Sequence, residues 1–111
     1  MLLTFDVGNT ETTLGLYDGA ELRAHWRIMT DVARTPDEFG VLLRGLLAGA
    51  EIALHDVTGV AIGSVVPPVT APLAEACRDW IPATRLEIID ARSPLPITLR
   101  VDEPLTVGAD R

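Results

Sequence analysis

Residues 2–28 read LLTFDVGNTETTLGLYDGAELRAHWRI, and this stretch decides the fold. Its side chains alternate in character with the two-residue period of β-strands, and polar residues interrupt the alternation twice. The three alternating runs are residues 2–7, 12–17 and 22–28. The chain is therefore predicted to open with three successive antiparallel strands.

The Asp18-Gly19 pair between the second and third runs predicts a tight hairpin. A type I′ turn requires positive φ at its two central residues, and both residue types tolerate that conformation. In the strand that follows, even and odd positions are expected to face opposite sides of the sheet. The apolar side would carry Leu22, Ala24, Trp26 and Ile28.

A helix is predicted to begin after Thr35, because Thr35 and Glu38 form a capping box and Pro36 suits the first helical position. Apolar residues then recur at helical spacing as far as Leu47, which indicates one buried face. Glycines inside this segment weaken the helix, so packing against other elements must stabilise it.

The nearly continuous apolar run of residues 59–66, GVAIGSVV, predicts a central strand that is covered on both faces. The Pro67-Pro68 pair ends that strand. A second helix is expected to follow as far as Trp80, with Pro72 tolerable only in its first turn.

Residues 86–89 are expected to form a last short strand, so the elements follow one another in the order β-β-β-α-β-α-β. An antiparallel meander followed by α/β crossovers implies an α/β fold with a mixed five-stranded sheet and helices on its faces. At 111 residues the chain has the length of one domain.

Charge and cysteine content exclude several classes of protein. The net charge is −7, and the 9 positive side chains are all arginine. Such a chain lacks the basic surface that nucleic acid or anionic lipid requires, and it has no lysine for a P-loop. Cys77 is the single cysteine, which excludes an internal disulfide. No run approaches the roughly 20 apolar residues that span a bilayer, so we expect a soluble, cytoplasmic protein without nucleic-acid or membrane partners.

The polar segment of residues 6–13, DVGNTETT, is the strongest candidate for chemistry. Asp6 ends a strand, Gly8 permits a sharp reversal, and the following side chains supply amide and hydroxyl donors. Such a turn can hold a phosphate group without lysine, and a neighbouring carboxylate can hold Mg²⁺. The alternative is an ordinary hairpin turn, because Gly-Asn-Thr is common turn chemistry.

The segment of residues 108–111, GADR, is the second candidate. An Asp-Arg pair at a chain end is most often solvated and without a role. Here it follows Pro104 where another structural element should begin, which favours a chain cut from a longer protein.

The D-x-G-N-T pattern at the end of a first strand resembles the first phosphate loop of the superfamily that contains actin, acetate and sugar kinases, and heat-shock ATPases. Their actin-like, ribonuclease H-like lobes have the element order predicted above. More narrowly, four blocks in this order and spacing resemble type III pantothenate kinase, and the resemblance spans the whole chain. The blocks are DVGNT (6–10), RTPDE (34–38), SVVPP (64–68) and GADR (108–111).

The resemblance implies an enzyme that phosphorylates pantothenate to 4'-phosphopantothenate with ATP and Mg²⁺, the first step toward coenzyme A. Asp6 would lie near the metal, and Asp110 would be the general base on the primary hydroxyl. Arg111 would meet the substrate carboxylate. The implied ATP-binding residues are Asp6, Val7, Gly8, Asn9, Thr10, Glu11, Thr12 and Thr13, and the implied pantothenate-binding residues are Val101, Gly108, Ala109, Asp110 and Arg111.

The same resemblance implies that residues 1–111 are the N-terminal lobe of a two-lobed, typically dimeric enzyme roughly twice as long, and that the isolated lobe is inactive. Family members also need a monovalent cation, potassium or ammonium, whose ligand would lie in the other lobe. One position departs from the family pattern: many members carry an aromatic residue where this chain has Val101.

Two other functions stay open on these residues. The chain could belong to a non-catalytic regulatory relative that keeps the loop for nucleotide binding or dimerisation. It could also belong to a nucleotide-hydrolysing relative with another acceptor. Asp110 and Arg111 favour the kinase, because a binding module needs no base beside an acceptor site.

Overall fold

The computed structural model describes residues 1–82 and 85–90, which form one sheet and three helical segments. The expected order of strands and α-helices is confirmed, and a short 3₁₀ helix that was not expected precedes the fourth strand. The strands are β1 (Leu2–Val7), β2 (Glu11–Asp18), β3 (Glu21–Met29), β4 (Gly59–Ser64) and β5 (Arg85–Asp90). The helices are α1 (Pro36–Gly49), η1 (Leu54–Asp56) and α2 (Pro67–Trp80).

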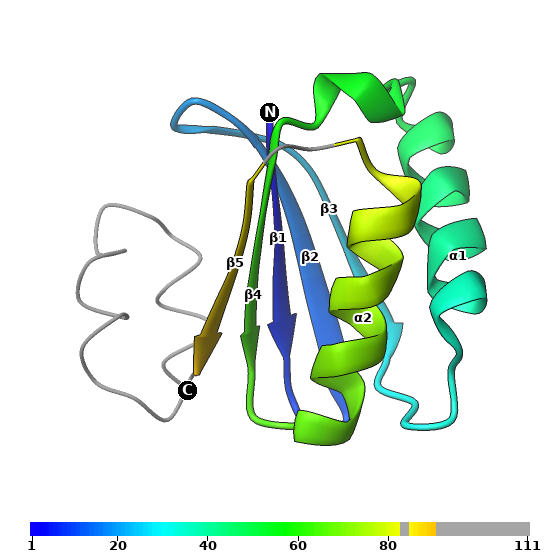
Figure 1. Ribbon diagram of the computed structural model, residues 1–111. Helices are drawn as coiled ribbons and strands as arrows, with labels where there is room; N and C mark the ends of the chain where they lie inside the picture. The colour runs from blue at the N-terminus through cyan, green and yellow to red at the C-terminus, as the bar shows by residue number, and fades with distance from the viewer. Residues whose placement is uncertain (83–84, 91–111) are drawn as a thin grey trace.

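The five strands make one mixed sheet in the spatial order β3-β2-β1-β4-β5, as Figure 1 shows. The opening meander pairs antiparallel, β1 with β2 and β2 with β3. The later strands pair parallel, β1 with β4 and β4 with β5. β1 and β4 therefore lie side by side and end at the same edge of the sheet.

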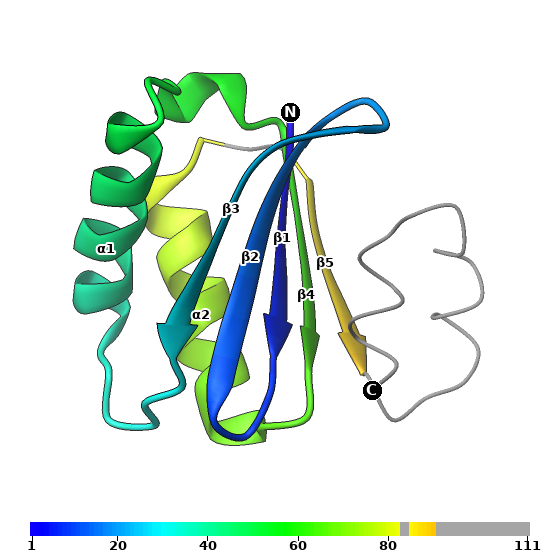
Figure 2. The ribbon, with the colours of Figure 1, turned by 180° about the vertical axis from the view of Figure 1, so that it is seen from behind.

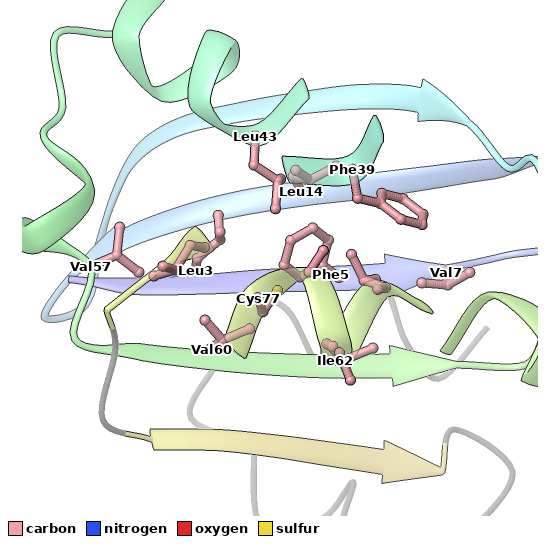
Figure 3. Packing of buried hydrophobic residues seen from close by; sticks show 14 of the residues in the cluster. Leu3, Phe5, Val7, Leu14, Phe39, Leu43, Val57, Val60, Ile62 and Cys77 are labelled. Carbon is pink, nitrogen blue, oxygen red and sulfur yellow. The ribbon is translucent and has the colours of Figure 1, made fainter. Parts of the chain in front are cut away.

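Both described α-helices cover the same face of the sheet. α2 stands in front of the strands in Figure 1 and behind them in the reverse view of Figure 2, and α1 lies beside α2. Between these layers lies a core in which Phe5 and Ile62 of the central strands meet Phe39 of α1 and Cys77 of α2 (Figure 3). Cys77 is only 2% exposed and belongs to this core.

The start of α1 confirms the expected capping box. The Glu38 backbone N–H donates to Thr35 Oγ1 at 3.1 Å, and the Thr35 N–H donates to Glu38 Oε1 at 2.8 Å. Pro36 occupies the first helical position. These contacts satisfy backbone donors that the first turn would otherwise leave unpaired.

The boundary between β4 and α2 differs from the expectation. The strand ends at Ser64 instead of Val66, and the helix already begins at Pro67. Pro72 is consequently the sixth residue of α2 and lies beyond the first turn. Pro72 has no N–H to donate to the carbonyl of Pro68, one turn earlier. Pro68 is exposed, so water can take the place of the missing donor.

The expected face of Leu22 is wrong. The register between β2 and β3 shifts, with Leu16 opposite Ala24 but Tyr17 opposite Leu22, so Arg23 is an extra residue on β3. This bulge turns Leu22 away from the core that Ala24, Trp26 and Ile28 contact. Leu22 is 46% exposed as a result.

The hairpin before β3 forms, but one residue later than expected. Its two loop residues are Gly19 and Ala20, because Asp18 still pairs with Glu21. Gly19 has a φ of 64°, and the only other residue with positive φ in the described ranges is Glu51. A type I′ turn needs positive φ at both central residues, so this turn is not of that type.

Candidate functional site

Three chain connections meet at the edge where β1 and β4 end. These are the β1–β2 turn, the β3–α1 loop and the β4–α2 turn, which lie together at the lower end of the sheet in Figure 1. In open α/β sheets, ligands bind outside the carboxyl ends of the parallel strands. This edge is therefore the candidate site, and it contains all of residues 6–13.

The β1–β2 turn is closed by a hydrogen bond from the Gly8 N–H to the Glu11 carbonyl at 2.9 Å. A Cβ atom at Gly8 would stand 3.1 Å from that oxygen, closer than most side chains could come without a shift. Asn9 and Thr10 form the exposed tip. Among the described residues, no hydrogen bond uses the backbone N–H of Asn9 or Thr10, so both can meet a ligand.

Asp6 and Thr13 lie opposite each other on the sheet face that α1 and α2 do not cover. They are register partners across β1 and β2, and Gly63 of β4 flanks Asp6 on its other side. The neighbouring Phe5 and Val7 point into the core instead. Asp6 is half-buried and Thr13 is exposed, so the structure brings these two polar side chains together near the turn.

Thr12 points the other way and is only 2% exposed. Its hydroxyl lies 2.9 Å from the hydroxyl of Thr30, which follows β3. Thr30 Oγ1 in turn donates to the Gly8 carbonyl at 2.7 Å. The DVGNTETT segment is thus divided between two faces of the sheet, and the Thr12 hydroxyl acts inside the fold.

Glu11 adds a carboxylate at the start of β2, and Arg27 of β3 lies beside it. Arg27 Nη1 and Glu11 Oε1 are 3.9 Å apart, and both side chains are more than half exposed. A pair so exposed contributes little to stability, but it offsets negative charge near the turn.

The β4–α2 turn is organised by Ser64. Its hydroxyl donates to the Val66 carbonyl at 3.2 Å and accepts from the Val66 N–H at 3.0 Å. The Val65 N–H donates to the Val7 carbonyl at 3.1 Å, which ties this turn to the end of β1. The SVVPP block therefore builds the wall of the site next to Asp6.

The first turn of α2 offers few donors to an anion. Pro67 and Pro68 have no N–H, and the Val69 N–H already donates to the Val66 carbonyl at 2.9 Å. A helix N-terminus usually binds anions through such free N–H groups. The start of α2 therefore contributes few backbone donors to this edge, whereas the N–H groups of Asn9 and Thr10 in the β1–β2 turn have no acceptor among the described residues.

A hollow of about 480 Å³ lies between α2 and β5 and reaches Ser64 at one end. Ala74 and Arg78 line it further along α2, and Ile88 of β5 lines the side that faces the helix. The hollow extends away from the β1–β2 turn and does not include it.

The fit of a divalent cation rests on Asp6. Residues 1–82 and 85–90 contain no cluster of three or more side chains that could ligate a metal. Mg²⁺ is commonly held by one or two carboxylates, with substrate phosphates and water completing its shell. One carboxylate between the small neighbours Gly63 and Thr13 suits that kind of site.

Val101 and the GADR residues Gly108, Ala109, Asp110 and Arg111 lie outside the described residues. Their expected roles therefore stay predictions. The sequence interpretation missed Thr30, which lies beyond the end of the third alternating run. The register of β3 against β2 places Met29 opposite Glu11, and the next residue, Thr30, therefore lies beside the turn. Knowledge of that register would have been the signal that identifies Thr30.

Neither α-helix in the described part of the chain is long enough to cross a membrane, since each has 14 residues.

Comparison with known proteins gives a match along nearly the whole sequence. A family model described as type III pantothenate kinase matches residues 2–111. A type III pantothenate kinase of Exiguobacterium sibiricum is 44% identical over all of this chain, which covers 44% of that protein. Those of Anaeromyxobacter sp. strain K and Geobacillus kaustophilus are 46% and 40% identical, and the chain covers 43% of each. The chain thus spans less than half the length of these relatives.

Two solved structures share the fold. A protein of Porphyromonas gingivalis assigned as an N-acetylglucosamine kinase superposes with a TM-score of 0.61 at 19% identity, over 79% of this chain and 33% of that one. A protein of Cytophaga hutchinsonii assigned as a sugar kinase superposes with a TM-score of 0.61 at 22% identity, over 90% of this chain and 39% of that one. These likenesses confirm the expected actin-like architecture.

Proposed function

The chain belongs to the type III pantothenate kinase family, and we therefore propose that the protein containing it transfers the γ-phosphoryl group of ATP to the primary hydroxyl of pantothenate. The observation that carries this proposal is the 40–46% identity, over the whole chain, to enzymes of that name. Because the chain covers 43–44% of those relatives, we propose that it is the N-terminal lobe of a two-lobed enzyme.

The β1–β2 turn is the proposed binding site for the ATP phosphates. Its exposed tip presents the N–H groups of Asn9 and Thr10, and the tight closure between Gly8 and Glu11 allows a ligand to approach the backbone. The hydroxyl groups of Thr10 and Thr13 can add donors. Because α2 begins with two prolines, its first turn adds few backbone donors to those of the β1–β2 turn.

Asp6 is the proposed protein ligand of Mg²⁺, directly or through water. When bound there, the cation would neutralise charge that develops on the transferring phosphoryl group. Asp6 itself, held in β1 between two hydrogen-bonded neighbours, would orient the cation relative to the turn. The sheet therefore fixes the carboxylate and the phosphate donors in one rigid frame.

Asp110 is the proposed general base, and Arg111 the proposed partner of the pantothenate carboxylate. The base would orient the primary hydroxyl in line and accept its proton as the phosphoryl group arrives. Gly108, Ala109 and Val101 would complete the acceptor site. These roles rest on the GADR block of the family.

The remaining features of the proposal concern the whole protein. We propose a homodimer that uses potassium or ammonium bound outside residues 1–111, and a cytoplasmic location. A reducing compartment suits the single free thiol of this chain.

The proposal is tested by an assay of the full-length protein that couples ADP release to NADH oxidation. We expect ADP release that depends on pantothenate, and a product that mass spectrometry identifies as 4'-phosphopantothenate. ADP release that is equally fast without pantothenate would indicate the nucleotide-hydrolysing alternative. ATP binding without turnover would indicate the non-catalytic alternative.

A further inference from the structure

Thr30 contacts the β1–β2 turn at two points, although it lies 22 residues from Gly8 in the sequence. Its backbone N–H donates to the Thr10 carbonyl at 2.9 Å. Its hydroxyl donates to the Gly8 carbonyl at 2.7 Å. One residue after β3 thus binds carbonyls on both sides of Asn9, the tip residue of the turn.

The direction of the hydroxyl protons follows from these contacts. A carbonyl oxygen can only accept, so the Thr30 proton is committed to Gly8. The Thr12 hydroxyl, 2.9 Å from Thr30 Oγ1, must then be the donor in that pair. The result is a directed chain from Thr12 to Thr30 to the Gly8 carbonyl, and the 2%-exposed Thr12 anchors it in the core.

The Gly8 carbonyl shares a rigid plane with the Asn9 N–H, because both belong to the same peptide unit. That unit is trans, like every described peptide bond, so its N–H points opposite to its carbonyl. Holding the carbonyl toward Thr30 therefore holds the Asn9 N–H away from Thr30. Glycine tolerates several backbone conformations, so without this bond the peptide after Gly8 could rotate.

We propose that Thr30 is a positioning residue, which fixes the Asn9 N–H in the orientation that receives a phosphate oxygen of ATP. The inference rests on the proposed function, since it assumes that the β1–β2 turn binds the nucleotide. A donor held in place before binding loses less entropy when the ligand arrives, which strengthens binding. Thr30 itself would not contact the reacting atoms.

The test uses the full-length protein and direct titration of ATP·Mg²⁺ by calorimetry, without pantothenate. Thr30→Val keeps the shape of the side chain and removes its hydroxyl. We expect it to weaken ATP affinity by about 5- to 10-fold, the range of one lost hydrogen bond. Thr30→Ser keeps the hydroxyl, so its affinity should stay within about twofold of wild type.

Thr4→Val is the matched control. The Thr4 hydroxyl also donates to a backbone carbonyl, that of Gly15 at 3.1 Å, but in the middle of the sheet. Its loss should lower the urea midpoint of unfolding as Thr30→Val does, while ATP affinity stays unchanged. A general loss of stability therefore cannot imitate the expected result.

Two results would overturn the inference: wild-type ATP affinity in Thr30→Val, or equal weakening in Thr30→Val and Thr4→Val. If Thr30→Val does not fold, Thr30→Ala gives the answer, because it removes the same donor to the Gly8 carbonyl with a smaller side chain. That variant should weaken ATP binding to a similar extent, and unchanged binding there overturns the inference as well. Failure of the proposed function is seen separately, as wild-type protein that binds ATP but does not phosphorylate pantothenate.

Discussion

The indole ring of Trp80 in α2 occupies the space directly over Gly40 of α1. A Cβ atom at Gly40 would overlap atoms of that ring. Arg44, one turn further along α1, places its guanidinium 5.3 Å from the centre of the same ring. The packing of Trp80 against α1 therefore depends on glycine at position 40, which explains why a helix-weakening residue stands inside α1.

We expect Gly40→Ala to lower the free energy of unfolding by about 1–3 kcal/mol, because the added methyl group must displace Trp80. Gly45→Ala is the control, since nothing lies within 4 Å of a Cβ atom there. That variant should raise stability by up to about 1 kcal/mol through helix propensity alone. Urea titrations of both variants measure the difference, and equal effects would contradict the proposed packing.

Asp6→Asn in the full-length enzyme is expected to lower kcat/KM by about 10²-fold or more, because an amide is a poor ligand for Mg²⁺ at the phosphates. The fold should survive, since Asp6 lies on the sheet face away from the core. Asp18→Asn is the matched control on the next strand, where the carboxylate pairs with Arg23 at 3.3 Å. Steady-state kinetics over a range of Mg²⁺ concentrations provide the measurement. A near-wild-type rate for Asp6→Asn would indicate an ordinary hairpin turn.

Asp110→Asn is expected to lower kcat by roughly 10²–10⁴-fold while ATP affinity and thermal stability stay nearly unchanged. Asparagine keeps the size of the side chain and removes its basicity, so the variant isolates proton transfer. If most of kcat remains, the base lies elsewhere in the enzyme.

Arg111→Ala is expected to raise the KM for pantothenate with little change in kcat, because it would remove the proposed contact with the substrate carboxylate, which would be made equally in the ground state and the transition state. Initial rates at varied pantothenate and saturating ATP separate the effect on KM from the effect on kcat. A fall in kcat at unchanged KM would place Arg111 at the transferring phosphoryl group instead.

The buried thiol predicts a pH dependence of stability. Loss of hydration raises the pKa of Cys77 from 9.0 to about 12, and the nearby charge of Arg78 opposes this only in part. Between these values the unfolded chain releases the thiol proton and the folded chain keeps it, so stability falls as the pH rises. The slope approaches about 1.4 kcal/mol per pH unit for this group.

The comparison of wild type with Cys77→Ala at neutral pH and at about pH 10 measures this effect. The alanine variant should be the less stable protein at neutral pH, because it leaves a cavity in the core. The difference in the free energy of unfolding between wild type and Cys77→Ala should become smaller as the pH rises. If that difference does not depend on pH, Cys77 is not the cause of the pH dependence of stability.

The isolated lobe of 111 residues should show no useful kinase activity. A phosphoryl-transfer site between two lobes needs both of them to exclude water and to position the acceptor. Assay of the purified lobe against the full-length enzyme at equal concentration tests this. Rapid turnover by the lobe alone would contradict the two-lobed arrangement.

The sequence by itself determined which segments form strands and helices and where the β1–β2 turn lies. The alternation in residues 2–28 and the capping box at Thr35 are local signals. Residues close together in the chain set the backbone conformation and the repeat with which side chains alternate between buried and exposed positions. The same local chemistry placed Asp6 at the end of β1.

Only the tertiary structure decided which of these side chains meet. The bulge at Arg23 turned Leu22 out of the core, and the register of β3 against β2 brought Thr30 to the Gly8 carbonyl. The fit of Gly40 to Trp80 required two helices to approach each other. Each of these contacts joins residues far apart in the chain, and their geometry depends on strand register and helix packing, which no local pattern of residues encodes.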